Sequence, residues 1–343
     1  MDVSLSDSEV MLRETAQRLA VDLACRSVQE LETWDGGPAW KTLQNAGFIG
    51  LRLPAAFGGG EGTTLDLALV VEAMARGPVP VPLLGSALAI ELLYAAGASP
   101  ELLERASTGD LRCTVALSPD LDQVAATEAG EVVGFDTEGA GLLLMFDSSG
   151  RRLRAVQAPP PKRGTDLTRN FTRADASNVV DLAGLGDELQ AESLNRLRAR
   201  SLALVSADLL GIMEGALEQT VSYASGRIQF GVPIGSFQAL QHLAADQLVS
   251  LEGARSLTEY AAWAVDHLDD QTALAAAVAA KGYSSRAARN LCEAAIQIHG
   301  GMGITWDCMA HVHLKRALFD ARLFGDHNQQ IVDLTALRQR RSA

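Results

Sequence analysis

Residues 223–248, YASGRIQFGVPIGSFQALQHLAADQL, are the stretch that decides the fold. We expect one helix to end near Gly226 and another to begin at Ser236, because a run of glycine and proline residues separates two helix-forming segments. The side chains that then project from the turn, rather than into a helical core, are Arg227, Phe230 and Gln238. A guanidinium suits a pyrophosphate, an aromatic ring suits a flat heterocycle, and an amide can read polar ring edges. The stretch is compatible with a cofactor-binding turn and, more simply, with an ordinary helix–turn–helix corner that carries a surface arginine.

A second stretch, residues 294–316 (AAIQIHGGMGITWDCMAHVHLKR), breaks a long predicted helix at a cluster of glycines. Glycine allows positive φ and leaves backbone N–H groups open to a ligand. The residues concerned are Gly300, Gly301 and Gly303, with Gln297 one helical turn before them. The spacing is not GxGxxG after a strand, so it is not the fingerprint of a dinucleotide-binding βαβ unit. The alternative is a glycine that ends a helix, with His299 in the core beside it.

The charge of the chain narrows the classes of partner. The 343 residues include 29 Lys and Arg against 42 Asp and Glu, which gives a net charge of −13. A field of this sign repels phosphate backbones and anionic lipid, so we expect no nucleic acid and no membrane partner. Hydrophobic residues make up 48% of the chain, the composition of a globular protein with a sizeable core.

The cysteines and the first residues predict a compartment. The 4 cysteines are scattered without metal-binding spacing and do not form a disulfide framework, which favours a reducing environment. The N-terminal sequence MDVSLSDSEV carries acids where a signal peptide is basic and then apolar. The apolar run TALAAAVAAK, from Thr272, is too short to span a bilayer. We therefore expect a cytoplasmic protein that binds no metal.

The texture of the chain changes twice, which predicts three domains. Residues 1–112 read as helices joined by glycine and proline turns, the first behind the N-cap signal of Ser6 and Asp7. Residues 113–188 hold the short runs CTVALS, EVVGF, GLLLMF and LRAVQA, which predict a small, shortened β-domain, while PPPKRG predicts a loop. Residues 189–343 are rich in Ala and Leu at three- and four-residue intervals, which predicts an antiparallel four-helix bundle. The helices expected there lie near 190–226, 236–267, 271–298 and 308–323.

Three segments of the chain together carry a resemblance. The pattern RxxFGxPIxxFQ in the first stretch, QxHGGxG in the second, and GFIGLRLPAAFGGGEGTTLDLALVVEAMARG at residues 47–77 resemble the acyl-CoA dehydrogenase family. The similarity runs over nearly the whole chain, in the order helical domain, β-domain and helical bundle. It implies the mostly α acyl-CoA dehydrogenase fold, assembled as a tetramer through the C-terminal bundle.

The resemblance also implies a cofactor, a substrate and partners. Members of the family use flavin adenine dinucleotide (FAD) to dehydrogenate a coenzyme A thioester, and the expected electron acceptor is electron-transfer flavoprotein. In that family the two motifs bind the adenosine and pyrophosphate part of a flavin housed mainly in the neighbouring subunit. The positions that correspond in this chain are Arg227, Phe230, Gln238, Gln297, Gly300 and Gly301.

The chain departs from the family at the catalytic base, which must be a group able to take a proton from an acidified C–H. Most members place a glutamate in a Tyr-Glu-Gly-Thr-like motif after the last long bundle helix, where this chain reads ALFDARLFGDHNQQI. Depending on register, the glutamate position falls on Phe324, Gly325 or Asn328, and none of these is a base. Asp326 is the nearest acid, but it is shorter than a glutamate and displaced in sequence.

A minority of members place the glutamate on the first bundle helix instead. Counting back from Arg227, that position falls on Ser201. Asp208 lies seven residues further on, on the same helical face, and is a candidate base, with helix packing or capping as the favoured alternative. The sequence therefore assigns no catalytic residue.

The β-domain departs from the family as well. The strand and turn that hydrogen-bond the flavin ring and the thioester in the family correspond to residues 114–134, TVALSPDLDQVAATEAGEVVG, where only Ser118 and Asp120 remain of the polar pattern. The flavin half-site of the chain's own β-domain is thus eroded, whereas the half-site donated to a neighbour is intact.

These departures predict a subunit of a flavin-dependent acyl-CoA dehydrogenase that completes the FAD site of a homologous catalytic partner. Heteromeric actinobacterial enzymes with unequal subunits, which act on steroid side-chain thioesters, provide the analogy, so steroid or fatty acid catabolism is the expected setting. The alternatives are a self-sufficient dehydrogenase with an atypical base and a non-enzymatic acyl-CoA-binding or structural bundle.

Overall fold

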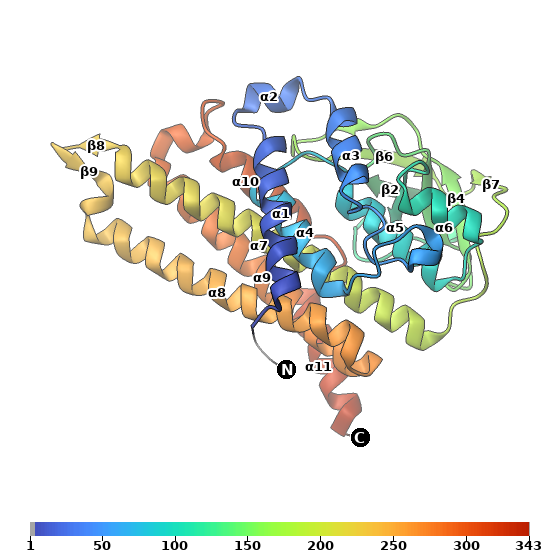
Figure 1. Cartoon of the computed structure of the whole chain (residues 1–343). Coiled ribbons are helices and arrows are strands. Elements are labelled where there is room, and N and C mark those ends of the chain that lie inside the picture. Colours follow the sequence, from blue (N-terminus) through green and yellow to red (C-terminus); the bar gives the residue numbers. More distant parts are fainter. Residues whose placement is uncertain (1–3, 343) are drawn as a thin grey trace.

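The computed structural model describes residues 4–342, and its N-terminal part is built from helices that begin at capping residues (Figure 1). These helices are α1 (Asp7–Leu23), α2 (Val28–Glu32), α3 (Gly36–Asn45), α4 (Thr64–Arg76), α5 (Leu83–Ala95) and α6 (Pro100–Ser107). Ser6 accepts a hydrogen bond from the N–H of Glu9, and the Glu9 carboxylate accepts one from the N–H of Ser6, so α1 begins with a capping box. Thr63 and Asp66 repeat this arrangement at α4. The predicted helix behind Ser6 is confirmed, whereas the prediction about the first residues falls partly on residues 1–3, outside the described ones.

The middle of the described chain forms a seven-stranded sheet in the order β5-β6-β2-β1-β3-β4-β7. Its strands are β1 (Cys113–Leu117), β2 (Glu131–Phe135), β3 (Leu142–Phe146), β4 (Leu153–Gln157), β5 (Lys162–Arg163), β6 (Asn170–Asp175) and β7 (Val179–Val180). Neighbouring strands are antiparallel except β1 and β3, which run parallel. The runs predicted as strands all form strands.

The predicted loop PPPKRG is wrong at its end. Its prolines stay outside the sheet, because proline cannot donate to a ladder, but Lys162 and Arg163 directly follow them and pair with Phe171 and Asn170 at the sheet edge. The strand β6, which receives them, carries the polar sequence NFTRAD and was not predicted.

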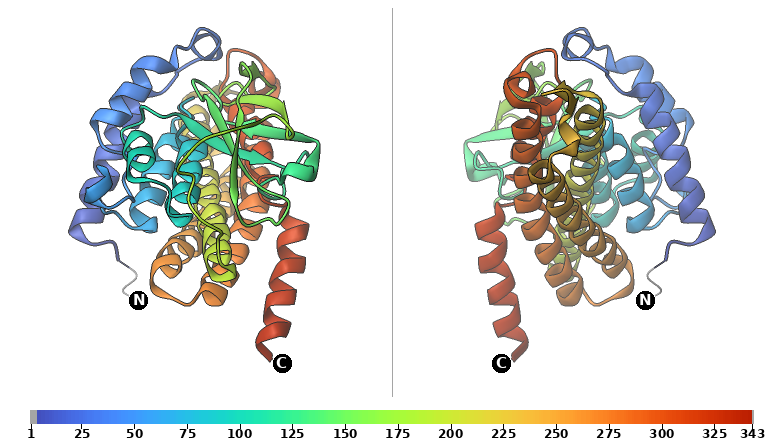
Figure 2. Two further views of the ribbon diagram at one scale, coloured as in Figure 1. Left: turned by 90° about the vertical axis from the view of Figure 1, so that its right-hand side faces the viewer. Right: turned by 90° about the vertical axis from the view of Figure 1, so that its left-hand side faces the viewer.

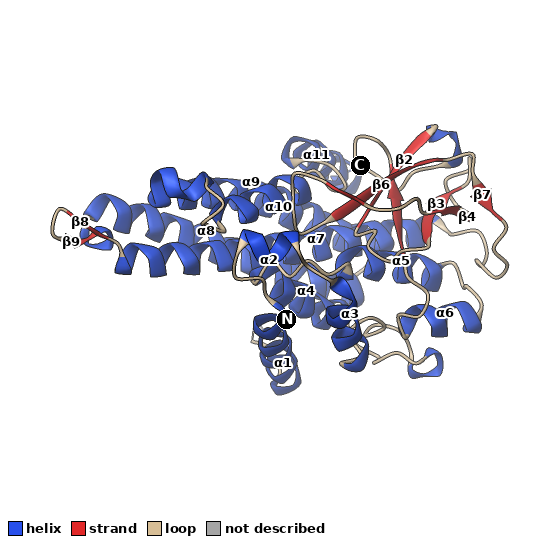
Figure 3. Ribbon diagram, turned by 90° about the horizontal axis from the view of Figure 1, so that it is seen from above, coloured by secondary structure: helices blue, strands red, loops and turns tan. Residues whose placement is uncertain are grey.

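The C-terminal part is the expected bundle, formed by α7 (Ala191–Gly226), α8 (Gln238–His267), α9 (Asp270–His299) and α10 (Ala310–Asp320). Seen from above, the long helices run from a small hairpin at one extremity of the molecule to the sheet at the other (Figure 3). The acyl-CoA dehydrogenase fold, mostly α with a central sheet, is confirmed. A further helix, α11 (His327–Ser342), was not predicted, and it extends beyond the rest of the fold (Figure 2).

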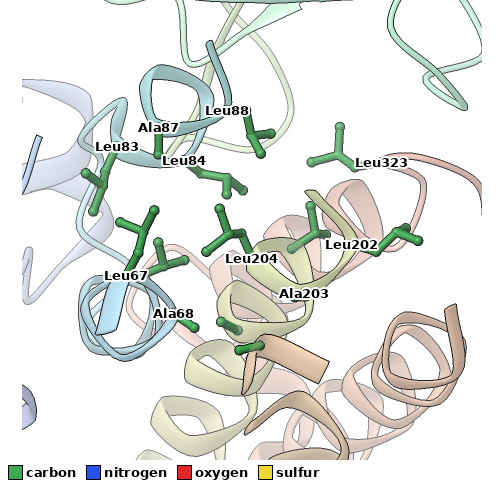
Figure 4. Close-up of a cluster of buried hydrophobic side chains, with 14 of the residues drawn as sticks. Leu67, Ala68, Leu83, Leu84, Ala87, Leu88, Leu202, Ala203, Leu204 and Leu323 are labelled. Carbon is green, nitrogen blue, oxygen red and sulfur yellow. The ribbon is translucent and has the colours of Figure 1, made fainter. Parts of the chain in front are cut away.

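The core that positions the site lies where three helices meet the turn before α11. Figure 4 shows Leu67 of α4, Leu84 and Leu88 of α5, and Leu204 of α7 pointing toward one another, with Leu323 at the edge of the cluster. All of these side chains are buried, and burying one leucine contributes about 1.5–3 kcal/mol. This packing fixes α5 and the turn before α11 against α7.

Within the described range, the helices are either too short or too polar to cross a lipid bilayer.

Candidate functional site

The first motif forms an exposed hairpin at the end of the bundle. β8 (Ile228–Gln229) and β9 (Val232–Pro233) pair there, beyond the end of α7 (Figures 1 and 3). The two residues of its turn, Phe230 and Gly231, have φ values of 52° and 81°. Positive φ at both positions suits the twist of a tight hairpin, but it strains a residue that carries a large side chain. The Phe230 ring is nevertheless 93% exposed, so the chain holds an aromatic ring in a strained and solvated position.

The second motif lies at the same end of the bundle. The ring of Tyr223, in the last turn of α7, stacks on the ring of His299, the last residue of α9, with centroids 4.4 Å apart and an interplanar angle of 19°. The chain then turns at Gly300, with φ 63°, into the 3₁₀ helix η4 (Gly300–Ile304). A Cβ atom on Gly300 or Gly301 would meet nothing within 4 Å, so both glycines present open backbone.

The predicted cofactor residues are all exposed. In the described range 4–342, the side chains of Arg227, Gln238 and Gln297 have no hydrogen-bond or ion-pair partner, and each lies at the surface. The structure thus brings the two motifs to one end of the bundle, where a ligand or a second chain can reach them. Their role in binding FAD stays a prediction.

The two sequence positions proposed for a base meet in one cavity. It encloses about 290 Å³ between the sheet, α5, α7 and the turn before α11, and both Ser201 and Phe324 line it. The Ser201 hydroxyl donates to the carbonyl oxygen of Leu197 on its own helix, at 2.9 Å. Most of the remaining lining is apolar: Leu88, Leu92, Val115, Val124, Ala126, Phe146, Leu194 and Leu197. Neither position of the family's base therefore carries a group that can take a proton from a substrate.

The turn that carries Phe324 is held from several directions. Phe324 and Gly325 have φ values of 57° and 95°, and the N–H of Phe324 donates to the carbonyl oxygen of Leu121 at 2.7 Å. The ammonium of Lys281, which is fully buried, donates to the carbonyl oxygens of Ala321 at 3.1 Å and Gly325 at 3.3 Å. Burial lowers the pKa of Lys281 to about 7, against the opposing effect of nearby carboxylates. The loop after β1 is thus fastened onto the position where the family has its base.

Asp122 is the carboxylate that sequence reasoning missed. Among the residues lining the cavity in the described chain it is the only acid, and it lies on the exposed side of the loop after β1. Its carboxylate accepts a hydrogen bond from the Ser118 hydroxyl at 2.5 Å, so the predicted remnant Ser118 is engaged within its own loop. Asp120, the second remnant, is exposed and does not line the cavity. Nothing in the sequence distinguishes Asp122 from Asp120, because only the course of the loop places one of them at the cavity.

The candidate base Asp208 is wrong. Its side chain is fully buried and paired with two guanidinium groups: Arg316, at 2.6 Å, and Arg169, at 2.8 Å. Burial alone raises the pKa of Asp208, but Arg316 and Arg169 outweigh it and hold the pKa well below its usual range. Asp208 also lies outside the cavity lining. It is a permanently charged member of a buried cluster rather than a proton acceptor.

This buried charge cluster joins the three parts of the fold. Arg169, from the loop before β6, also pairs with Asp136 after β2 at 2.7 Å and with Asp320 at the end of α10 at 3.0 Å. Asp136 in turn accepts a hydrogen bond from the N–H of Gly85 in α5, at 2.9 Å. Burial raises the pKa of Asp320 well above its usual value, as does the neighbouring Asp208 carboxylate. The side chain at position 208 therefore has the packing role that was the alternative.

The candidate base Asp326 is wrong as well. Its carboxylate accepts a hydrogen bond from the N–H of Gln329 at 3.0 Å, which caps the N-terminus of α11. It also pairs with Arg322 at 3.5 Å. Asp326 lies outside the cavity lining and starts a helix.

Comparisons with known proteins agree over most of the chain. Residues 6–105 match the family model "Acyl-CoA dehydrogenase, N-terminal domain", and residues 187–332 match "Acyl-CoA dehydrogenase, C-terminal domain". The acyl-CoA dehydrogenase IpdE2 of Mycolicibacterium smegmatis is 31% identical over 97% of this chain and 99% of its own length. IpdE2 of Mycobacterium tuberculosis is 32% identical over 91% of this chain and 92% of its own length.

Solved structures show the same fold. A variant of the Tcur3481-Tcur3483 steroid ACAD superposes with a TM-score of 0.85 at 24% identity, and 99% of each chain is covered. The ChsE4-ChsE5 complex from Mycobacterium tuberculosis superposes with a TM-score of 0.80 at 24% identity, over 98% of each chain.

Proposed function

Because the chain belongs to the acyl-CoA dehydrogenase family, whose cofactor is FAD, we propose that it is the partner subunit of a heteromeric acyl-CoA dehydrogenase. In this proposal it supplies Arg227, Phe230 and the Gly300–Gly301 turn to a flavin held mainly by a homologous chain. That homologous chain supplies the catalytic base.

The observation that carries the proposal is the contrast between the cavity and the hairpin. Ser201 and Phe324 line one cavity, so both family positions for the base converge on it, and neither residue can accept a proton. The hairpin end, in contrast, keeps every residue of the two motifs in an exposed position. A chain that needed only its bundle as a scaffold would have no use for a strained, exposed Phe230 beside an unpaired guanidinium.

The residues at the hairpin end fit the adenosine diphosphate part of FAD. A pyrophosphate carries about two negative charges, which Arg227 can pair with through a planar fork of donors. The open backbone at Gly300 and Gly301 allows close approach of the same group. When bound, FAD supplies the acceptor for the hydride that leaves the substrate's β-carbon. This chain's residues bind and orient it from the far side.

The substrate class of the assembly follows by analogy. Relatives and structural neighbours include a steroid ACAD and the ChsE4-ChsE5 complex, which supports a heteromer that acts on steroid-derived or fatty acyl thioesters. Electron-transfer flavoprotein is the proposed acceptor of the electrons, and a tetramer of two unequal pairs is the proposed assembly.

A self-sufficient dehydrogenase is the second candidate, and Asp122 is the observation that favours it. Its carboxylate is the acid at the cavity, although the hydrogen bond from Ser118 ties it to the loop. In this alternative the chain would dehydrogenate a thioester by itself, and Asp122→Asn would abolish that activity.

A pairing experiment tests the proposal. This chain, a homologous chain that carries the Tyr-Glu-Gly-Thr-like motif, and the co-expressed pair are each assayed for thioester-dependent reduction of an artificial electron acceptor, with a panel of short-chain, long-chain and sterol-derived thioesters. We expect turnover by the pair and none by this chain alone. Robust turnover by this chain alone, lost in Asp122→Asn, would establish the second candidate instead.

A further inference from the structure

A second, smaller cavity lies behind the glycine turn. It encloses about 230 Å³ between the segment before α2, the end of α7 and the η4 turn. Cys308 and His299 both line it, together with Arg26, Tyr223, Met302 and Asp307. None of the roles proposed above for the two motifs uses the thiol of Cys308.

The His299 ring is held in one orientation. Its Nδ1 lies 2.8 Å from the carbonyl oxygen of Ala295, which can only accept, so Nδ1–H is the donor and Nε2 is left free for another partner. That partner is the side chain of Cys308, with which His299 forms a hydrogen bond. The Tyr223 ring stacks on the imidazole and fixes its plane. A histidine fixed in this way can take the thiol proton and return it to a bound molecule.

The backbone around Cys308 adds to this. Cys308 lies just before the first turn of α10, and the N–H of Ala310 hydrogen-bonds its sulfur. The N-terminus of a helix favours negative charge, which here is a thiolate. Partial burial raises the pKa of Cys308, but the hydrogen bonds from His299 and Ala310 and the charge of His299 outweigh it, so the pKa lies below its ordinary value.

The other cysteines provide an internal comparison. Cys25, Cys113 and Cys292 are buried, and burial raises the pKa of Cys25 and of Cys113 to about 12 and that of Cys292 further still. Cys308 combines partial exposure, a cavity and a paired histidine. A thiolate of this kind reacts with soft electrophiles far faster than a buried thiol does.

We propose that Cys308 and His299 form a covalent modification site for small electrophiles of the α,β-unsaturated carbonyl class. The thiolate sulfur attacks the β-carbon and a C–S bond forms. The π electrons of the C=C bond move to the α-carbon, which takes the proton held on His299. The step is an addition, so it needs no oxidant, no reductant and no leaving group.

The cavity sets the size of the electrophile. Its volume equals roughly eight water volumes at about 30 Å³ each, enough for a short enoyl group but not for coenzyme A. The choice of this electrophile class rests on the proposed function, because an α,β-unsaturated thioester is the product of acyl-CoA dehydrogenation. The reactivity of the thiol does not rest on it. An adduct would lie directly behind the Gly300 turn.

The test uses the full chain without flavin or partner, so its outcome is separate from that of the proposed function. The protein is incubated at pH 6.5 with crotonyl-N-acetylcysteamine, a short unsaturated thioester, and the labelled cysteine is located by peptide mass mapping. We expect Cys308 to be modified first, about fivefold or more faster than free N-acetylcysteine at that pH, because its larger thiolate fraction outweighs the lower nucleophilicity of a low-pKa thiol. The saturated butyryl analogue should give no adduct.

Variants separate activation from mere exposure. Cys308→Ser should abolish the first adduct. His299→Gln should slow it about fivefold or more, whereas His242→Gln, at an exposed histidine on α8, should not change it. Thermal melting checks that the variants fold, and if His299→Gln does not, the pH profile of wild-type labelling replaces it, with an inflection expected below the usual thiol pKa of about 8.5. First labelling at another cysteine, an unchanged rate in a folded His299→Gln protein, or an inflection at the usual value would overturn the proposal.

Discussion

The two ends of the bundle differ in what their polar groups contact. At the hairpin end, Arg227, Gln238 and Gln297 have no partner within residues 4–342, and Phe230 is held in a strained turn with its ring in solvent. At the sheet end, the charged side chains of the cluster around Arg169 are buried and paired with one another. An exposed end with unpaired functional groups is complementary to something the chain does not itself contain, whereas a closed and self-satisfied end serves as scaffold.

The largest effect is expected where the closed end is broken. Asp208→Ala removes the carboxylate that pairs with Arg316 and Arg169 and leaves two buried guanidinium groups short of a partner. Breaking a buried pair in this way costs about 3–5 kcal/mol of unfolding free energy. Chemical denaturation should show this loss for Asp208→Ala and a change of no more than about 0.5 kcal/mol for Asp120→Ala, at an exposed acid of the neighbouring loop. An Asp208→Ala protein as stable as the wild type would show that the cluster does not hold the domains together.

The pH dependence of stability probes the same end through Lys281. In the folded chain its pKa is lowered by burial from 10.5 to about 7, so between these values the unfolded chain binds more protons. The free energy of unfolding should therefore rise with pH from about 7 upward, by up to about 1.4 kcal/mol per pH unit from this group.

Comparing the wild type with Lys281→Met between pH 7 and 8.5 isolates that contribution, because other titrating groups are common to both proteins. The slope of unfolding free energy against pH should be smaller in Lys281→Met. Identical slopes in the two proteins would mean that the buried amine keeps its proton throughout.

The hairpin end should respond in the opposite way, through the ligand and not through stability. Arg227→Ala should weaken flavin retention in the assembled oligomer about tenfold or more, which corresponds to roughly 1.4 kcal/mol. Arg227→Lys should recover only part of this, since a point charge cannot reproduce the planar fork. Arg152→Ala, at an exposed arginine of the sheet end, is the matched control. Melting temperatures should be unchanged in all three, and full flavin occupancy in Arg227→Ala would remove the assignment.

The sequence predicted those elements whose signal is local. The helices of the bundle carry Ala and Leu at helical intervals, and α1 begins at the serine that its sequence indicated. α11 escaped because HNQQIVDLTALRQRR has no continuous apolar face, and β6 because NFTRAD alternates weakly. These elements form because of what they pack against.

The candidate site shows the same limit. The convergence of Ser201 and Phe324 could be anticipated, because each corresponds to a family position for the same chemical group. The pairing of Asp208 with Arg169 and Arg316 could not, since those residues are far apart in sequence and only the assembled fold brings them together. The position of Asp122 at the cavity depends on the course of one loop.

The flavin content of the purified heteromer tests the central claim most directly. FAD absorbance and polypeptide concentration are measured for this chain alone, for its co-expressed homologous partner, and for the pair with wild-type or Arg227→Ala forms of this chain. The account predicts one flavin for every pair of unlike chains, a reduced amount with Arg227→Ala, and none with this chain alone. One flavin per polypeptide in a homo-oligomer of this chain, reduced by an added thioester, would contradict it.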